Sequence, residues 1–546
     1  MNPSTALARV VIDELIRHGV TDAVISPGSR SAPLAYAVQD ADREGRIRMH
    51  VRVDERSAAF LALGMAKVSR RVVPVITTSG TAVANLHPAV LEAHHAQVPL
   101  LVLSADRPPE LRGTGANQTT VQRAIFGEAV RWEHELGAPE EHEESNAVWR
   151  SVMSRAVAAA QGRVSGWPGP VHVNVPLREP LAPSLDDHGE SHGGPCQAGQ
   201  AGWPGGLGWP GGLAGRADGG PWVRLPPVGE ADALAQIPRT LVLMGDLPVP
   251  GMAQHVVDVA ERHGWPVVAE PFGEFDRSRV LPHGPLLLTV GEWVDANLPD
   301  RALAVGRLTL SRAVARVLSS ARTVESVTAE PHWTDPGRVS SRVYTFDTFR
   351  TSVPPPTPPD PADAAWTQAW RAAGAAVAAA AGDLVSAAPS SLGAARTILS
   401  QLPPGAQLFV GSSNSIRDID LASTSLSHEV SIVASRGLAG IDGCLSTAIG
   451  LALTTERPAY ALVGDLTFIH DANGLVIGPD EPVPNLTILV VNDDGGGIFT
   501  LLEYGAPERA DDFERIFGTP TRVDIADVCR ARGIDHVRVS GLDHLH

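Results

Sequence analysis

Two acidic segments near the end of the chain each follow an apolar run. "YALVGDLT" supplies Asp465, and "TILVVNDDGGG" supplies Asn492, Asp493 and Asp494. Ligands bind outside the carboxyl ends of strands in open parallel sheets, and these two runs lie about one βαβ unit apart. Carboxylate and amide oxygens suit Mg²⁺, which binds through one or two carboxylates together with substrate phosphates. Either segment alone indicates a turn with a helix cap, whereas the pair predicts a metal-bridged diphosphate.

Two common phosphate-binding motifs are absent from the sequence. There is no Walker loop of the form G-x-x-x-x-G-K-[ST]. In "GTGANQ", Gln118 stands where the third glycine of a dinucleotide-binding loop should be. These absences disfavour mononucleotide kinases and simple NAD-dependent oxidoreductases.

The elements that must position the acidic segments are short apolar strands alternating with helical patterns. In the first part of the chain, strands are predicted at "DAVISPG", "VVPVITTSG", "PLLVLSADRP" and "GPVHVNVP", and helices at "ERSAAFLALGMAKVS" and "TAVANLHPAVLEAHHA". Further strands are predicted at "TLVLMGD", "PVVAEP", "ALAVGR", "QLFVGSS", "VSIVASRG", "AYALVGD" and "NLTILVVND". Such alternation is typical of doubly wound parallel α/β sheets. The sequence therefore predicts an α/β protein.

Two connectors divide the chain into three predicted α/β domains, at residues 1–185, 226–350 and 366–546. Residues 186–225 contain "GWPGGLGWPGGLAG", which is too rich in Gly and Pro to pack a core and is interpreted as a flexible linker or insertion. Residues 351–365, which contain "TSVPPPTPPDPADA", come after the second domain and are interpreted as a stiff proline-rich linker.

Composition narrows the class of protein. The chain has 546 residues, 43% of them hydrophobic, and a net charge of −17, which disfavours a general nucleic-acid or membrane-surface binder. Cys196, Cys444 and Cys529 are few, widely spaced and odd in number, which indicates a reducing compartment. The N-terminal segment lacks the layout of a signal peptide, and no apolar run reaches membrane-spanning length. We therefore expect a cytoplasmic protein without integral membrane association.

Several motifs together carry a family resemblance. They are "HVRVDERSAAFLALGMAKVSRRVVPVITTSGTAVANLHPAV", "ISPGSRSAPL", "TSGTAVANL", "SADRPPELRGTGANQTT", "SRGLAGIDG" and "GDLT", the last followed by the Asn/Asp-rich strand end. In this order they closely resemble the SEPHCHC synthase (MenD) family of thiamine-diphosphate enzymes. The resemblance covers almost the whole chain outside residues 186–225 and is weakest in the central domain.

The resemblance implies a transferase of menaquinone biosynthesis. Such enzymes decarboxylate 2-oxoglutarate and add the resulting carbanion to isochorismate, with thiamine diphosphate and Mg²⁺ or Mn²⁺ as cofactors. The three domains would be pyrimidine-binding, central and diphosphate-binding, and relatives continue beyond "GLDHLH", so the third domain is expected to lack a final helix and strand. A homodimer or homotetramer with active sites at the subunit interface is also implied.

The resemblance assigns the cofactor residues. Glu55 would be the catalytic acid that activates the cofactor through its pyrimidine ring, although alone it would be interpreted as a helix-start acid. Ile441 in "GIDG" would support the bent cofactor. Asp465, Asp493 and the carbonyl of Gly495 would hold the metal ion. Asn492 stays an alternative ligand, because the interval from Asp465 to Asp493 is one residue longer than usual.

Both implied substrates are dianions, which arginine forks hold through paired hydrogen bonds. Taken singly, each arginine is more often a solvated surface charge, and the matching motifs reverse that interpretation. The implied substrate-binding residues, with Arg312 as the best alignment in the central domain, are Ser29, Arg30, Arg107, Asn117, Gln118, Arg312, Ser413, Arg417 and Arg436.

Three other classes stay open. An acetolactate-synthase-like protein or a 2-oxoacid decarboxylase would share the cofactor but would not need so many arginines. A catalytically inactive scaffold has weak support from the Trp-Pro-Gly repeat. An NAD-dependent oxidoreductase is disfavoured by the missing glycine motif.

Overall fold

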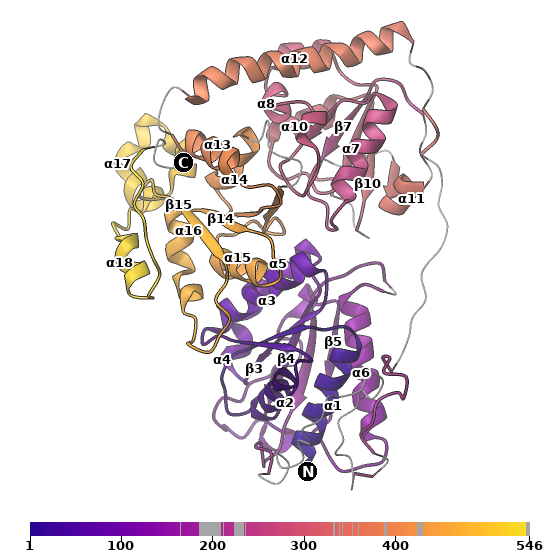
Figure 1. Cartoon of the computed structure of the whole chain (residues 1–546), viewed down its shortest axis with the longest axis vertical. Coiled ribbons are helices and arrows are strands. Elements are labelled where there is room, and N and C mark those ends of the chain that lie inside the picture. The colour runs from indigo at the N-terminus through magenta and orange to yellow at the C-terminus, as the bar shows by residue number, and fades with distance from the viewer. Residues whose placement is uncertain are drawn as a thin grey trace. The chain divides into compact units, whose positions relative to one another are not determined.

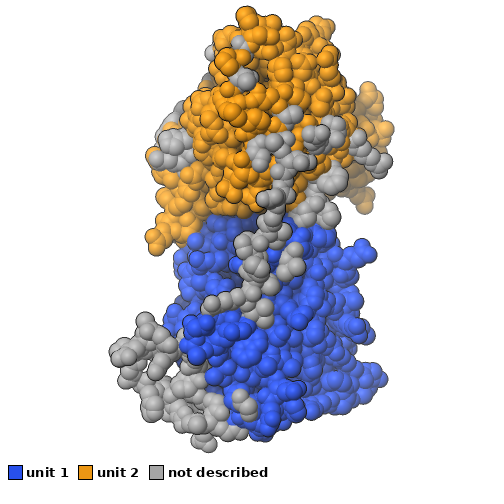
Figure 2. All heavy atoms as spheres, turned by 90° about the vertical axis from the view of Figure 1, so that its right-hand side faces the viewer, with its two compact units in different colours: residues 1–227, 445–454, 471–484 blue, residues 228–444, 455–470, 485–546 orange. Residues whose placement is uncertain are grey.

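The computed structural model describes residues 1–541 except 164, 185–208, 211, 223–233, 235, 331–333, 338, 341, 352, 357, 359, 387–389 and 423–429. The described strands form three parallel sheets that alternate with helices (Figure 1), which confirms the predicted α/β fold class. The chain forms two compact units (Figure 2), the first from residues 1–227, 445–454 and 471–484, the second from 228–444, 455–470 and 485–546. This division does not follow the three predicted domains, whose boundaries stay predictions.

The first unit contains a sheet of six strands in the order β2-β1-β3-β4-β6-β5, with every neighbouring pair parallel. All residues of β3, β4 and β6 are buried, as expected for strands covered on both faces. The strands are β1 (Asp22–Ile25), β2 (Arg48–Val51), β3 (Val73–Thr77), β4 (Leu100–Asp106), β5 (Trp132–Glu135) and β6 (Val171–Pro176). The helices are α1 (Pro3–Arg17), α2 (Ala32–Arg43), α3 (Glu55–Ser69), α4 (Thr81–Ala84), α5 (His87–Ala96) and α6 (Ser145–Ala160).

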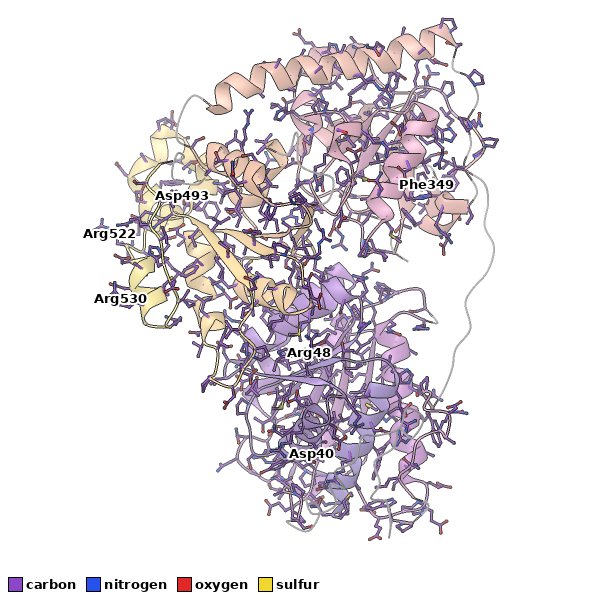
Figure 3. All side chains as sticks on the ribbon, viewed as in Figure 1. Asp40, Arg48, Phe349, Asp493, Arg522 and Arg530 are labelled. Atoms are coloured by element: carbon purple, nitrogen blue, oxygen red, sulfur yellow. The ribbon has the colours of Figure 1, made fainter. Side chains whose placement is uncertain are left out.

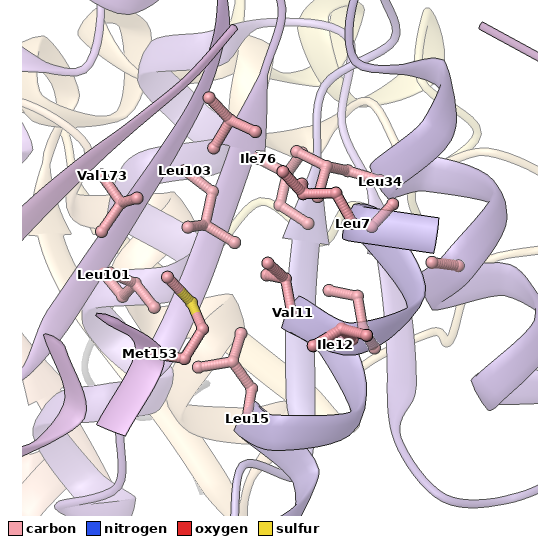
Figure 4. Close-up of a cluster of buried hydrophobic side chains, with 14 of the residues drawn as sticks. Leu7, Val11, Ile12, Leu15, Leu34, Ile76, Leu101, Leu103, Met153 and Val173 are labelled. Carbon is pink, nitrogen blue, oxygen red and sulfur yellow. The ribbon is translucent and has the colours of Figure 1, made fainter. Parts of the chain in front are cut away.

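The N-terminal helix α1 shows why these residues fold as they do. Asn2 caps it by accepting a hydrogen bond from the Thr5 N–H, and Pro3 occupies its first turn, where a missing N–H costs nothing. Leu7 and Leu15 then recur on one face and pack against strand residues such as Leu101 (Figure 4). Burial of this apolar stripe stabilises the helix on the sheet.

The second unit contains the other two sheets, with strand orders β11-β10-β9-β7-β8 and β13-β12-β14-β15. The strands are β7 (Thr240–Met244), β8 (Val267–Ala269), β9 (Arg301–Val305), β10 (Thr323–Thr328), β11 (Arg342–Thr345), β12 (Gln407–Val410), β13 (Ser431–Ala434), β14 (Ala459–Gly464) and β15 (Leu486–Val491). The helices are α7 (Met252–His263), α8 (Gly284–Leu287), α9 (Gly291–Ala296), α10 (Arg312–Ser320), α11 (Phe346–Thr351), α12 (Pro361–Ser386), α13 (Ser391–Gln401), α14 (Asn414–Ala422), α16 (Asp465–His470), α17 (Ala510–Phe513) and α18 (Ile525–Arg530). Helix α15 (Cys444–Leu453) lies almost entirely in the first unit.

The predicted proline linker at 351–365 is too long at both ends. Helix α11 reaches Thr351, and α12 already begins at Pro361. Asp360 accepts a hydrogen bond from the Asp363 N–H at 2.8 Å, and proline fits the first position of a helix. Although α12 is rich in alanine, no helix in the described part of the chain is long and apolar enough to cross a membrane.

The interpretation of residues 186–225 as unable to pack a core is wrong at one position. Trp209 is buried in the core of the first unit, with its ring centroid 5.8 Å from that of Trp149, and Leu213 packs beside them. A single large aromatic ring buries enough apolar surface to dock a Gly/Pro-rich segment. Residues 185–208, which include Cys196, lie outside the described part, while Cys444 and Cys529 are buried and form no disulfide.

Candidate functional site

The two acidic strand ends lie side by side. Strands β14 and β15 are parallel neighbours, with Gly464 paired to Val491, so Asp465 and residues 492–494 leave the same edge of the sheet. Asp465 begins α16 and is buried, and burial raises the pKa of its carboxyl to about 6. The Asp493 carboxyl adds to this rise, and the Leu466 N–H opposes it. A buried carboxyl group whose ionisation is disfavoured by burial and by a second carboxyl group fits a site for a divalent cation.

The loop after β15 separates the two candidate ligands. Asn492 turns its side-chain oxygen back to accept from the Asp494 N–H at 3.0 Å, and Asp494 adopts a left-handed conformation with φ 56°. Asp493 is exposed on the second unit (Figure 3), and its Oδ2 lies where a Cβ at Gly497 would stand. The Asp493 carboxyl thus acts on Asp465, while the Asn492 oxygen is bonded within its own loop.

The cation site would depend on few protein ligands. Among the described residues, no group of three or more His, Cys, Asp or Glu side chains could hold a metal ion. A pair of carboxylates with one backbone carbonyl is the kind of set that suits Mg²⁺, which keeps waters and phosphate oxygens as its other ligands. The Gly495 carbonyl, which accepts from the Gly497 N–H at 3.1 Å, is available as that carbonyl because a carbonyl oxygen has two lone pairs.

The remaining predicted residues of the second unit occupy different environments. Arg417 donates from Nη1 to the Ser413 carbonyl at 2.6 Å, and Ser413 has φ 77°. Arg436 is buried and donates from Nε to the Thr309 hydroxyl at 3.1 Å. Arg312 is exposed at the start of α10. Ile441 is half-buried between β13 and α15.

In the first unit, two predicted arginines lie close enough to repel each other. Burial lowers the pKa of the Arg30 guanidinium and the charge of Arg107 lowers it further, while Glu179 and Asp106 partly oppose this. Arg107 donates to the Ser79 hydroxyl at 2.6 Å and to the Gln118 side-chain oxygen at 3.4 Å. An anion bound between the two guanidinium groups would relieve this repulsion, so the pair fits a carboxylate.

Glu55 is the first residue of α3, directly after the turn that follows β2. Asp54 caps the helix by accepting from the Ser57 N–H at 3.1 Å. Glu55 is half-buried, and in the described structure its carboxyl forms no hydrogen bond or ion pair. Ser29 and Asn117 are both exposed. In the described structure, their side chains form no hydrogen bond to another predicted site residue.

Sequence reasoning missed two acids near these residues, the half-buried Asp418 and the buried Glu270. Burial raises the pKa of Asp418, beside Arg417, and the Asp493 charge contributes. Glu270, directly after β8, accepts from the N–H groups of Thr309 and Leu310 at 2.8 and 2.7 Å, and burial raises its pKa to about 7. Its position at a strand end was the available signal.

The chain is similar to known proteins along nearly its whole length. Residues 5–125 match the family model for the N-terminal TPP-binding domain of thiamine pyrophosphate enzymes. The chain is 44% identical over 549 residues to a Saccharopolyspora erythraea protein named 2-succinyl-5-enolpyruvyl-6-hydroxy-3-cyclohexene-1-carboxylate synthase, covering 99% of this chain and 92% of that one. Proteins of the same name from Nocardia farcinica (44%, 99% and 92% covered) and Kineococcus radiotolerans (46%, 98% and 92% covered) are similar to it over the same extent.

Proposed function

Because the chain belongs to the family of 2-succinyl-5-enolpyruvyl-6-hydroxy-3-cyclohexene-1-carboxylate synthases, which use thiamine diphosphate, we propose that it makes this product from 2-oxoglutarate and isochorismate in menaquinone biosynthesis. It is a carbon–carbon bond-forming transferase. Similarity over 99% of the chain to relatives of this name is the observation that carries the proposal. The cytoplasmic location expected from the cysteine content belongs to the same proposal.

Metal and cofactor binding are proposed for the paired strand ends. Asp465, Asp493 and the Gly495 carbonyl would hold Mg²⁺ or Mn²⁺, and the ion would neutralise the two carboxyl groups and the cofactor diphosphate. The raised pKa of Asp465 supports this, because a bound cation would stabilise the ionised carboxyl group that burial and Asp493 disfavour. Ile441 would press on the cofactor from the segment before α15.

Glu55 would work by holding a proton at a nitrogen of the cofactor's pyrimidine ring. Bound thiamine diphosphate supplies the carbon nucleophile for a 2-oxo acid. The capped first turn of α3 fixes the Glu55 backbone, and its carboxyl has no competing partner in the described structure. Arg30, Arg107, Arg417 and Arg436, with Arg312 and the polar Ser29, Ser413, Asn117 and Gln118, would hold the carboxylates of the two substrates.

We expect Arg417→Lys to weaken substrate binding while leaving the cofactor bound. Lysine keeps the charge but loses the planar fork, and a hydrogen bond to a charged group contributes about 1.5–3 kcal/mol. The value of kcat/KM for the affected dianion should therefore fall roughly 10- to 100-fold. Steady-state kinetics would measure this, with Arg371→Lys on the exposed face of α12 as a matched control. Unchanged kinetics in Arg417→Lys would remove Arg417 from the site.

A dimer with shared active sites is proposed because exposed apolar residues lie in and near the segments that meet at the β2–α3 turn, which precedes Glu55. Val53, Val476 and Val483 are 76%, 50% and 82% exposed in the first unit, next to side chains that contact the β2–α3 turn. Exposed apolar surface of this kind marks protein interfaces. A second copy of the chain would cover it and bring its diphosphate site to Glu55.

Mixed subunits test the shared site. If Glu55 and Asp465 act in trans, each mixed dimer of Glu55→Gln and Asp465→Ala chains keeps one intact site. Random mixing should therefore restore up to roughly a quarter of the parent activity. Mass spectrometry of the intact dimers would verify mixing. Complete dimer mixing without any activity would place both residues in the same subunit's site.

Substrate dependence tests the function itself. Isochorismate should disappear only when 2-oxoglutarate, thiamine diphosphate and Mg²⁺ are all present, and pyruvate should not replace 2-oxoglutarate. Consumption of pyruvate alone would instead favour the acetolactate-synthase-like alternative.

A further inference from the structure

Residues 471–484 follow the metal-site helix α16 in sequence but belong to the first compact unit, where they lie against the turn that carries Glu55. Three polar side chains of this segment contact residues on both sides of Glu55. Asp471 reaches Ser57, Asn473 reaches Asp54, and Glu481 reaches Val51 and Arg52. We call this segment the brace.

Asp471 is the buried end of the brace. Its Oδ2 accepts from the Ser446 N–H at 2.7 Å, and its Oδ1 accepts from the Ser57 hydroxyl at 3.4 Å. Ser446 lies in the first turn of α15 and Ser57 in the first turn of α3, where N–H groups lack helical partners. A carboxylate there also interacts favourably with two helix dipoles. Asp471 therefore joins the starts of two helices.

The same two helices are in close contact along their length. A Cβ at Gly64 of α3 would overlap the Thr447 carbonyl oxygen, and a Cβ at Gly450 of α15 would overlap the Leu61 carbonyl oxygen. Glycine at both positions lets the backbones touch, so α3 packs directly against α15. A link between their first turns then fixes where α3 begins.

The other two brace contacts hold the strand and the cap before Glu55. β2 is an edge strand, and Glu481 accepts from the Val51 N–H at 2.7 Å and forms an ion pair with the buried Arg52 at 3.5 Å. Asn473 donates to the free oxygen of the Asp54 cap at 3.2 Å. The last residues of β2, the cap and the first turn of α3 are thus each held from outside their own elements.

We propose that Asp471 is a positioning residue for Glu55. By joining the first turns of α3 and α15, Asp471 fixes the direction in which the Glu55 carboxyl meets the cofactor; this rests on the proposed function. The half-buried Glu55 has no partner of its own in the described structure, so its direction depends on its backbone. Misplacement of a catalytic group by ~1 Å can cost about 10²-fold in rate.

The test measures exchange of the thiazolium proton of bound thiamine diphosphate into heavy water by NMR. Asp471→Ala should slow the exchange about 10- to 100-fold. Asp471→Asn should restore most of the rate, because its amide can accept from Ser446 and donate to the Ser57 hydroxyl. The exposed Asp480→Ala, in the same segment, is the control and should match the parent.

A double variant separates positioning from a general structural role. In a Glu55→Gln background, Asp471→Ala should slow exchange by less than about twofold more, because coupled residues are not additive. Equal slowing in both backgrounds, or parent-like exchange in Asp471→Ala, would overturn the proposal. If Asp471→Ala does not fold, Ser57→Ala, which removes only a hydroxyl, should slow exchange several-fold, and a parent rate there would overturn the proposal. A parent chain that binds no thiamine diphosphate would overturn the proposed function instead.

Discussion

Replacing Glu55 by Gln should reduce the turnover rate about 10²–10⁴-fold while the protein stays folded, which is the range that a positioned acid–base group contributes. Gln has nearly the same size, and the Asp54 cap that begins α3 does not involve the Glu55 side chain. An amide cannot exchange the proton that the carboxyl shares with the cofactor's pyrimidine nitrogen. The direct measurement is exchange of the thiazolium proton of bound cofactor, followed by NMR in heavy water.

A matched control decides whether Glu55 is only a helix-start acid. Glu292 lies in the first turn of α9 and is exposed, so Glu292→Gln removes the same dipole interaction without touching the proposed site. It should leave exchange and turnover unchanged. Exchange at the parent rate in Glu55→Gln would show that Glu55 has no catalytic role.

Asp465→Ala should abolish the stabilisation that thiamine diphosphate and Mg²⁺ give to the parent. A ligand at ~100 times its Kd adds about 2.7 kcal/mol to the free energy of unfolding, so the parent should melt at a clearly higher temperature with both present. The variant should show no such shift, and NAD should shift neither protein. Because burial raises the pKa of Asp465 to about 6, its ionised form is unfavourable without a cation, and the cofactor-free variant should melt no lower than the parent.

Two variants in the loop after β15 provide the comparison for Asp465→Ala. Asp493→Ala should behave like Asp465→Ala, whereas Asn492→Ala should keep the thermal shift, because the Asn492 oxygen is bonded to the Asp494 N–H. A shift lost in Asn492→Ala but kept in Asp493→Ala would identify Asn492 as the metal ligand. A shift with NAD and none with the thiamine cofactor would contradict the cofactor assignment.

The apolar strands could be predicted from the sequence because burial on both faces requires continuous apolar runs, as in β4 and β7. Strands that were not predicted include β5 and β10, in which charged side chains interrupt the apolar pattern. β5 reads "WEHE", and β10 contains Glu325, whose burial is offset by Arg301 on β9 at 3.1 Å. Such a pairing depends on which strands are neighbours, which periodicity does not reveal.

The residues of the candidate site also divide into those that the sequence could predict and those that it could not. Asp465 and Asp493 could be predicted to meet, because both follow strands of a parallel sheet one βαβ unit apart. Asp471 could not, since its contact with Ser57 spans 414 residues and depends on how the chain returns to the first unit. Motif resemblance identified Arg436, but not the Thr309 hydroxyl that fixes it.

The most direct test of the proposed function is mass spectrometry of the product made from uniformly ¹³C-labelled 2-oxoglutarate and unlabelled isochorismate. With thiamine diphosphate and Mg²⁺, the parent chain should form one product that contains isochorismate and every labelled carbon except the one released as carbon dioxide. Omitting the cofactor or using Glu55→Gln should nearly abolish it. A parent that binds the cofactor but leaves isochorismate unlabelled, or joins two 2-oxo acids instead, would contradict the account.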